Sequence, residues 1–167
     1  MQNVYIGLGS NLADPRAQVE HALSALGDVP RTALLLRSRL YRSAPWGRAD
    51  QPEFVNAVAE LRTALTPHEL LAALLAIERG AGRERDATRW GPRMLDLDIL
   101  IYGDRLIDEP GLHVPHPHLH ERAFVLLPLA EIAPDLSVPG RGHVADLARQ
   151  IDTAGCRPLE IAATSHQ

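Results

Sequence analysis

The sequence predicts an α+β protein with a ferredoxin-like fold: an antiparallel βαββαβ sheet with both helices on one face, followed by C-terminal additions. Two observations lead to this prediction. Apolar residues recur with strand and helix periodicity in the order strand, helix, strand, strand, helix, strand. Within the strands, apolar side chains alternate with polar or small ones, as in a sheet covered on one face. At 167 residues and 46% hydrophobic content, we expect one domain over residues 1–167.

The first strand and helix are marked by residue types at their ends. A β-branched and aromatic run over residues 3–8 predicts the strand. Asp14 followed by Pro15 forms a helix N-cap with proline in the first turn, and Gly27 ends the segment. Between them, apolar residues follow helical spacing at Val19, Ala22, Leu23 and Leu26.

Two strands, a helix and a last strand complete the expected sheet. The strands are predicted at residues 33–41 and 54–65. Thr66 and Pro67 begin the second helix, which ends near Gly80, and residues 95–102 form the fourth strand. In the C-terminal additions, a weaker pattern predicts a helix over residues 144–151.

Alternation in the last two strands separates a core face from a working face. The predicted core face consists of Val55, Ala57, Ala59, Leu61, Leu95, Leu97, Ile99 and Ile101. The opposite face carries Phe54, Asn56, Val58, Met94, Asp96, Asp98 and Leu100. In a ferredoxin-like sheet the first strand usually lies between these two strands, and here it adds a low floor of Tyr5, Gly7 and Gly9. A site with an aromatic and amide end and an acidic end is therefore predicted on the face without helices.

Asp96 and Asp98 are two residues apart in a strand, so their side chains leave it in parallel, about 6.5 Å apart at the backbone. Two carboxylates at this spacing suit one or two Mg²⁺ ions, which also take waters and substrate phosphates as ligands. The alternative is a pair of solvated acids on an exposed sheet face. Arginines crowd the segment just upstream, which also contains glycines and Trp90, and this favours a loop that closes over phosphates. They are Arg79, Arg83, Arg85, Arg89 and Arg93.

Composition excludes several classes of function. All 17 basic residues are arginine, which excludes mechanisms that need a Walker-A lysine, a kinase strand lysine or a Schiff base. The net charge of -4 gives no reason to expect nucleic acid as a partner. A single cysteine, an N-terminus unlike a signal peptide and no long apolar run lead us to expect a cytoplasmic protein without membrane contact.

A histidine cluster leaves two interpretations open. Zinc is one, because imidazole is a common zinc ligand, but the intervening prolines and the lack of a nearby cysteine weigh against it. The other, which we favour, is a histidine that donates to a nucleotide phosphate. The cluster consists of His113, His116, His118 and His120.

Four ordered blocks carry a resemblance to a known family. They are "YIGLGSNL" at residues 5–12, "DQPEFVNAV" at 50–58, "RWGPRMLDLDIL" at 89–100 and "VPHPHLHERAFVLLPLAEIAP" at 114–134. Together they closely resemble the 6-hydroxymethyl-7,8-dihydropterin pyrophosphokinases of folate biosynthesis. The resemblance runs from about residue 4 to 137, and the third block is its most specific part.

The resemblance implies transfer of pyrophosphate from ATP to the pterin hydroxymethyl group, with AMP as the other product and two Mg²⁺ ions as cofactors. It implies that Asp96 and Asp98 bind the metal and, with Arg83 and Arg93, form the catalytic set. The implied pterin-binding residues are Ser43, Ala44, Trp46, Phe54, Asn56 and Phe124. The implied ATP-binding residues are Glu78, Arg83, Arg85, Trp90, Arg93, Ile99, His116 and Arg122. We expect a monomer whose partners are these two small substrates.

Two other functions would explain part of the sequence pattern. A nucleotidyltransferase of the polymerase-β type also pairs Gly-Ser with Asp-x-Asp, but there the motifs lie close together, whereas most of the domain separates Ser10 from Asp96. A ferredoxin-like binding or regulatory module would explain the fold but not the aspartate pair and the arginine-rich loop. Formation of AMP would separate the enzyme from this module.

Overall fold

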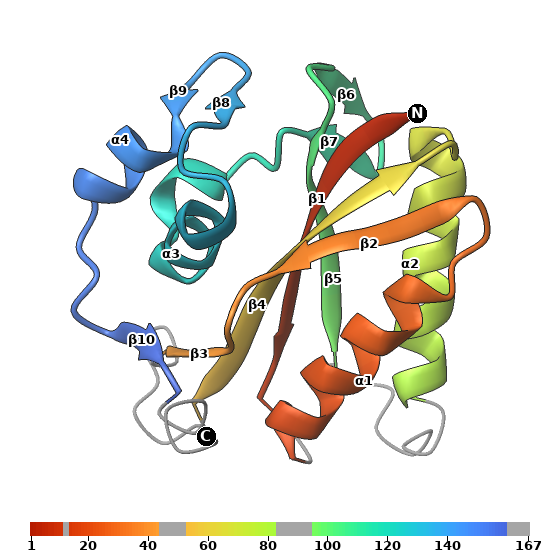
Figure 1. The fold of residues 1–167 in the computed structure, drawn as a ribbon, viewed down its shortest axis with the longest axis horizontal. Helices are drawn as coiled ribbons and strands as arrows, with labels where there is room; N and C mark the ends of the chain where they lie inside the picture. The colour runs from red at the N-terminus through yellow and green to blue at the C-terminus, as the bar shows by residue number, and fades with distance from the viewer. Residues whose placement is uncertain (12–13, 44–52, 83–94, 160–167) are drawn as a thin grey trace.

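The computed structural model describes residues 1–11, 14–43, 53–82 and 95–159, and its ribbon is drawn in Figure 1. A six-stranded antiparallel sheet lies at its centre, in the order β10-β3-β4-β1-β5, with β2 also paired to β4. The strands are β1 (Gln2–Ser10), β2 (Thr32–Arg37), β3 (Tyr41–Ser43), β4 (Phe54–Thr63), β5 (Asp96–Tyr102) and β10 (Cys156–Pro158). The position of β1 between β4 and β5 confirms the ferredoxin-like arrangement predicted from the sequence.

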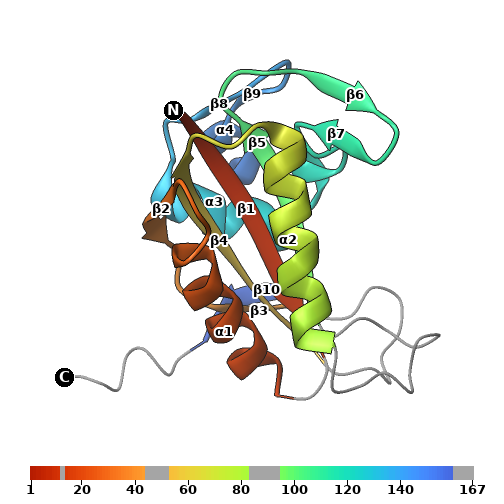
Figure 2. The ribbon, with the colours of Figure 1, turned by 90° about the vertical axis from the view of Figure 1, so that its right-hand side faces the viewer.

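Helices α1 (Pro15–Gly27) and α2 (Pro67–Gly82) cover one face of the sheet, in front of β1 and β4 in Figure 2. The carboxylate of Asp14 accepts from the Ala17 N–H at 3.2 Å, which confirms the predicted N-cap. The apolar side of each helix packs on the sheet, and Leu70 and Leu74 of α2 are fully buried. The core beneath them contains Val4, Ile6, Leu8, Ala57, Leu61 and Leu97, as the alternation predicts.

The opposite face is not free of helices, which corrects the sequence-based prediction. Helix α3 (Ala123–Ile132) lies against it beside β4, and α4 (Val144–Arg149) packs on α3 (Figure 1). A second apolar core fills the space between them, where Tyr5, Val58 and Leu126 are buried. The site predicted for this face is therefore partly roofed by α3. Helix α4 confirms the helix expected over residues 144–151.

Strand β5 departs from the expected alternation at one point in its pairing with β1. Tyr5 pairs with Ile101, whereas the next residue, Ile6, pairs with Ile99, so β5 has one extra residue at Leu100. Such a bulge shifts the side-chain phase by one. Ile101 consequently lies in the second core beside α3, and its prediction for the α1 and α2 face is wrong.

The strand predicted over residues 33–41 is two strands. At the break, the Ser38 N–H donates to the Val58 carbonyl at 2.9 Å, and the Ser38 hydroxyl accepts from the Val58 N–H at 3.0 Å. The side chain of Ser38 thus replaces its own carbonyl in the ladder, which lets the chain turn between β2 and β3. Both strands still pair with β4.

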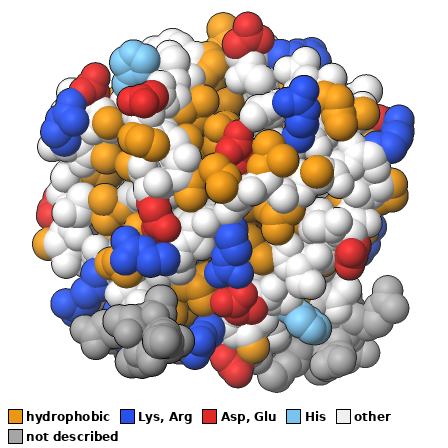
Figure 3. Space-filling view, in the orientation of Figure 1, with side chains coloured by type: hydrophobic (Ala, Val, Ile, Leu, Met, Phe, Trp, Pro, Cys, Tyr) orange, Lys and Arg blue, Asp and Glu red, His pale blue; other side chains and the backbone are white. Residues whose placement is uncertain are grey.

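Short elements connect these parts. They are the hairpin of β6 (Ile107–Glu109) and β7 (Leu112–Val114), the 3-10 helix η2 (Leu119–Glu121), and the hairpin of β8 (Ser137–Val138) and β9 (Gly142–His143). In Figure 3 hydrophobic side chains form a band down the middle of the face seen in Figure 1, interrupted by charged groups. No helix in the described ranges is long and apolar enough to cross a membrane.

Candidate active site

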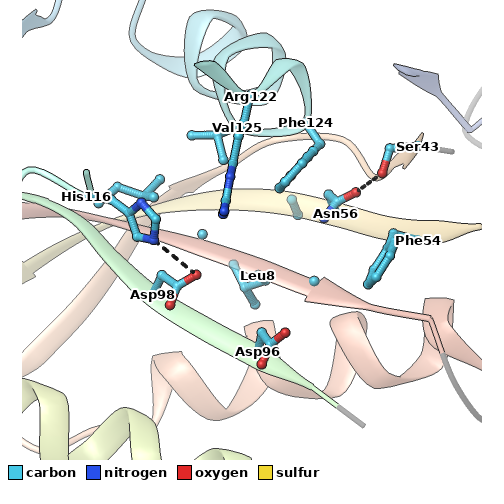
Figure 4. A pocket seen from close by; sticks show the side chains of 14 residues that line it. Leu8, Ser43, Phe54, Asn56, Asp96, Asp98, His116, Arg122, Phe124 and Val125 are labelled. Carbon is cyan, nitrogen blue, oxygen red and sulfur yellow. Dashed lines mark hydrogen bonds and ion pairs between the residues drawn. The ribbon is translucent and has the colours of Figure 1, made fainter. Parts of the chain in front are cut away.

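A pocket of about 250 Å³ opens on the α3 side of the sheet (Figure 4). Its floor is the middle of the sheet, its roof is the N-terminal part of α3, and its outer wall is the segment before η2. It is lined by Gly7, Leu8, Gly9, Ser43, Phe54, Asn56, Ala57, Asp96, Asp98, Leu100, His116, Arg122, Phe124 and Val125. Eight of the sequence-predicted site residues are in this lining: Ser43, Phe54, Asn56, Asp96, Asp98, His116, Arg122 and Phe124.

The floor is low because β1 has glycine at two pocket positions. A methyl group on Gly9 would lie 2.8 Å from Asn56 Nδ2, closer than real Cβ contacts allow. A methyl group on Gly7 would lie 3.2 Å from a Leu100 methyl carbon. The two glycines therefore keep the sheet surface open between the amide end and the acidic end, as the sequence predicts.

The aromatic and amide end is built on β3, β4 and α3. The buried Asn56 accepts at Oδ1 from the Ser43 hydroxyl at 2.7 Å, so its NH₂ group is left to face the floor and the pocket. Figure 4 shows Phe54 and Phe124 to either side of Asn56, and both rings are half-buried. A flat heterocycle between two rings, with one edge on a carboxamide, matches this arrangement.

The acidic end is formed by the first residues of β5. Asp96 and Asp98 are both exposed, and Figure 4 shows both carboxylates on the pocket side of the strand. Two carboxylates on an open rim supply hard oxygen ligands, so the residues fit Mg²⁺, which takes its remaining ligands from water and substrate. Within the described ranges, no group of three or more His, Cys, Asp or Glu residues could hold a metal without such additional ligands.

His116 closes the pocket beside Asp98. Its Nε2 lies 4.0 Å from Asp98 Oδ2, and its Nδ1 accepts from the His118 N–H at 3.1 Å. Burial, with Arg122 as the next cause, lowers the pKa of His116 to about 4. The ring is therefore neutral at neutral pH, and because Nδ1 is an acceptor, the proton is on Nε2, which faces the pocket.

Arg122 supplies the positive charge opposite the aspartates. It caps the N-terminus of α3, and its guanidinium lies 5.5 Å from the Phe124 ring centre. Figure 4 shows its side chain pointing from the helix into the pocket. The planar guanidinium and the positive end of the helix favour an anion at this point.

Two predicted ATP-binding residues, Glu78 and Ile99, do not line the pocket. The carboxylate of Glu78, on α2, accepts from the Leu97 N–H at 2.7 Å and so caps the outer edge of β5 between the two aspartates. The Ile99 side chain is buried in the core beneath α1 and α2, so a contact with nucleotide would involve its backbone. The other predicted site residues, Ala44, Trp46, Arg83, Arg85, Trp90 and Arg93, lie outside the described residues.

The pocket is also lined by residues that the sequence did not predict for the site. Val125 follows Phe124 in α3 and lines the roof, and Leu8 and Ala57 reach its edge from the sheet. Val125 could not be found from periodicity, because the segment that contains it was not predicted to be a helix.

The other histidines of the cluster contact acidic residues outside the pocket, and two of them share Glu121. His113 Nδ1 lies 2.7 Å from Asp108, and His118 Nδ1 lies 3.0 Å from Glu121. His120 lies 3.5 Å from the second oxygen of Glu121. Only His116 of the four lines the pocket. This arrangement matches the interpretation in which one histidine serves a phosphate site.

Comparison with known proteins shows the family of the chain. The model of a family described as 7,8-dihydro-6-hydroxymethylpterin-pyrophosphokinase (HPPK) matches residues 5–134. A Pseudomonas aeruginosa protein named 2-amino-4-hydroxy-6-hydroxymethyldihydropteridine pyrophosphokinase is 56% identical over 147 residues, which cover 88% of this chain and 90% of that protein. A Haemophilus influenzae protein of the same name is 46% identical over 150 residues, covering 90% and 93% of the two chains.

Solved structures share the fold. The crystal structure of wild-type Plasmodium falciparum HPPK-DHPS with pteroate has a TM-score of 0.70 at 14% identity, over 89% of this chain and 44% of that chain. This chain thus spans less than half of that structure's chain, and at this identity the likeness concerns the fold alone. The family match and the two close relatives, both covered over nearly their whole length, identify the chain as a member of the 7,8-dihydro-6-hydroxymethylpterin-pyrophosphokinase family.

Proposed function

We propose that this chain transfers the pyrophosphoryl group of ATP to the hydroxymethyl group of 6-hydroxymethyl-7,8-dihydropterin, with release of AMP, as a step of folate biosynthesis. The observation that carries the proposal is the single pocket with a ring-and-amide end and a two-carboxylate end. The first end suits a flat pterin, and the second suits a metal-bound triphosphate. The family name and the names of the relatives support the same transfer.

Pterin binds at the end formed by Phe54, Asn56 and Phe124. The rings take the two faces of the bicycle, and the Asn56 carboxamide, oriented by Ser43, pairs with its polar edge. Ala44 and Trp46 follow Ser43 in the sequence, outside the described residues, and the family resemblance assigns them to pterin binding as well. The hydroxymethyl group then points along the glycine floor toward β5.

ATP binds at the acidic end, with Mg²⁺ held by Asp96 and Asp98. These two carboxylates would hold the metal, which would supply positive charge against the charge that develops on the phosphates. The Nε2–H of neutral His116 and the guanidinium of Arg122 hold phosphate oxygens from the opposite side. Arg83, Arg85, Trp90 and Arg93 follow α2 in the sequence, outside the described residues, and the family resemblance assigns them to the nucleotide, with Arg83 and Arg93 balancing charge on the leaving AMP.

The reaction itself forms one bond and breaks one. The hydroxymethyl oxygen attacks the β-phosphorus of ATP, the bond from that phosphorus to the oxygen bridging it to the α-phosphorus breaks, and AMP leaves with that oxygen. The hydroxyl proton is released to solvent. No side chain of the pocket needs to act as a nucleophile, because such transfers depend on positioning and charge neutralisation.

Product analysis with matched acceptors tests the proposal. The protein is incubated with ATP and Mg²⁺ and with 6-hydroxymethyl-7,8-dihydropterin, with 6-methyl-7,8-dihydropterin as an acceptor without the hydroxyl, or with no acceptor. We expect one AMP per pterin diphosphate with the first acceptor, no AMP in the other two incubations, and no reaction with a chelator. Equal AMP release without the hydroxymethyl acceptor would identify a nucleotide hydrolase instead.

A further inference from the structure

The two ends of α3 contact different parts of the protein. Its first turn holds Arg122 and Phe124 at the pocket, whereas Glu131, one residue before its end, contacts the chain that connects β2 to β3. That chain continues into Ser43, which orients Asn56. Helix α3 and strand β3 therefore supply two sides of the ring-and-amide end of the pocket.

Glu131 joins these two elements with both of its carboxylate oxygens. One oxygen accepts from the Arg39 backbone N–H at 3.0 Å. The other accepts from the Tyr41 hydroxyl at 2.7 Å and from Arg39 Nε at 3.4 Å. The Glu131 side chain is only 26% exposed, so these charge-assisted bonds are partly shielded from water. A glutamine could accept with one of these atoms but not with both.

The strand register connects Glu131 to the pterin contacts. Tyr41 pairs with Asn56, and Ser43 pairs with Phe54. Because paired and alternate residues share a face, the side chains of Tyr41, Ser43 and Asn56 lie on the side of the sheet where α3 packs. Tyr41 is buried, and its burial and the bond to Glu131 raise its pKa to about 12, so the phenol remains a donor at neutral pH.

Strand β10 holds β3 from its other edge. Cys156 pairs with Ser43, Pro158 pairs with Tyr41, and the Leu159 N–H donates to the Leu40 carbonyl at 2.9 Å. Backbone pairing on both edges thus fixes β3 within the sheet. The contact with Glu131 acts in another direction, across the face of the sheet, where it sets the height of α3 above β3.

We propose that Glu131 is a positioning residue for the pterin: it holds α3 against Arg39 and Tyr41, and so fixes Phe124 relative to Ser43 and Asn56. This inference rests on the proposed function, because it names what sets the spacing of the pterin contacts. Glu131 itself contacts no ATP in this proposal. Arg122 lies at the same end of α3 as Phe124, but the other proposed ATP contacts, Asp96, Asp98 and His116, are on β5 and on the segment before η2, which Glu131 does not touch. ATP binding should therefore depend less on Glu131 than pterin binding does.

A substitution with a matched control tests the proposal. Glu131→Gln is compared with Glu20→Gln, which alters a more exposed carboxylate that is also bonded to an arginine, Arg37 at 2.8 Å, on the α1 side of the sheet. The measurements are KM for each substrate, pterin affinity by fluorescence titration, and the thermal midpoint. We expect Glu131→Gln to weaken pterin binding roughly tenfold, while KM for ATP changes less than about twofold. Glu20→Gln should leave both KM values unchanged.

The split between the two KM values separates positioning from a purely structural contact. A lower midpoint with unchanged KM values, or an equal change for both substrates, would overturn the proposal. Should Glu131→Gln not fold, Tyr41→Phe serves in its place, because it removes one hydrogen bond to Glu131 and retains the ring. Pterin binding should again weaken more than ATP binding, but by a smaller factor. If the wild-type protein neither binds nor converts the pterin, the proposed function fails; if it does both and the variants match it, only this inference fails.

Discussion

Asp96 and Asp98 are neighbouring like charges on an exposed rim, an arrangement that favours a bound cation over two free carboxylates. Their separation along β5 lets both reach one side of the strand, and the Asp98 side chain is 50% exposed. Water can therefore reach the proposed metal position before substrate arrives. The function of this end of the pocket depends on charge more than on shape.

Replacing either aspartate with asparagine keeps the volume and removes the charge. We predict that Asp98→Asn or Asp96→Asn lowers turnover on the order of 10²–10³-fold, because metal and phosphate charge are no longer held in place. Folding stability without metal should be equal or higher, since one like charge is gone. AMP formation and thermal unfolding measure the two effects. Asp104→Asn, in the exposed turn after β5, is the control, and wild-type turnover in Asp98→Asn would remove the metal assignment.

Gly9 is required by the side chain opposite it. A Cβ at this position would meet Asn56 Nδ2 at 2.8 Å, so Gly9→Ala must displace the carboxamide that Ser43 orients. We predict pterin affinity roughly tenfold lower, with ATP binding unchanged. Gly27→Ala is the matched control, because a Cβ there meets nothing within 4 Å. Fluorescence titration with pterin checks this, and an unaltered affinity in Gly9→Ala would mean that Asn56 does not contact the pterin.

The lowered pKa of His116 predicts a pH dependence of stability. In the folded protein the pKa is about 4, against roughly 6.5 in an unfolded chain, so between these values the unfolded state binds a proton that the folded state does not. Stability of the metal-free protein should consequently fall as pH drops from 6.5 to 4. His116→Gln removes this titration, so its urea midpoint should fall less over the same range. Parallel curves for the two proteins would contradict the buried, neutral histidine.

Among the elements, helix α2 supports the proposed metal position through an edge of the sheet. Strand β5 lies at one edge of the sheet, and an edge strand has backbone groups that no neighbouring strand pairs with. Glu78 satisfies one of them, the Leu97 N–H at 2.7 Å, between the two aspartates. On the same strand, the Leu100 carbonyl accepts from the His116 N–H at 2.9 Å. The first bond holds β5 to α2, and the second holds β5 to the His116 segment.

We predict that Glu78→Ala destabilises the protein by about 1–3 kcal/mol, because a partly buried N–H loses its acceptor. Glu78→Gln keeps an acceptor oxygen and should cost much less. Urea unfolding without substrates measures both variants. Equal stability of Glu78→Ala and wild type would show that water replaces the carboxylate without cost.

The sequence predicted the elements with clear periodicity and missed those with conflicting signals. Helix α3 is apolar on nearly all sides and contains Pro128, which lacks the N–H that an interior helical residue donates, so neither periodicity nor propensity indicates a helix. The bulge at Leu100 leaves no trace in an apolar run, because Leu100 and Ile101 are equally suited to either core. The break at Ser38 depends on a side-chain bond that a strand pattern does not reveal.

The site was more predictable than its surroundings. Asn56, Asp96 and Asp98 are polar residues in apolar strands, and the strand period alone assigns them to one face. Phe124 and Arg122 were reached only through the family resemblance, because their place over the sheet depends on the unpredicted α3. The histidine cluster by itself indicated a phosphate-binding histidine, and the resemblance singled out His116. Glu131 had no signal in the sequence, since an acidic residue near a helix end is ordinary on a surface.

At the scale of the whole molecule, the sheet joins segments that are far apart in the chain. Ser43, Asn56 and Asp98 come from β3, β4 and β5, and α3 adds Phe124 from the other side. The chain after residue 134, beyond the range of the family match, returns to the sheet as β10 beside β3. This return closes the edge of the sheet next to the proposed pterin position.

The fate of each phosphorus atom of ATP distinguishes pyrophosphoryl transfer from transfer of a single phosphoryl group. The protein is given ATP labelled at the α, β or γ phosphate in separate reactions with 6-hydroxymethyl-7,8-dihydropterin and Mg²⁺, and the products are separated. We predict that the β and γ labels are both found in the pterin product in equal amounts, while the α label remains in AMP. Transfer of the γ label alone, with the β label left in ADP, would contradict it.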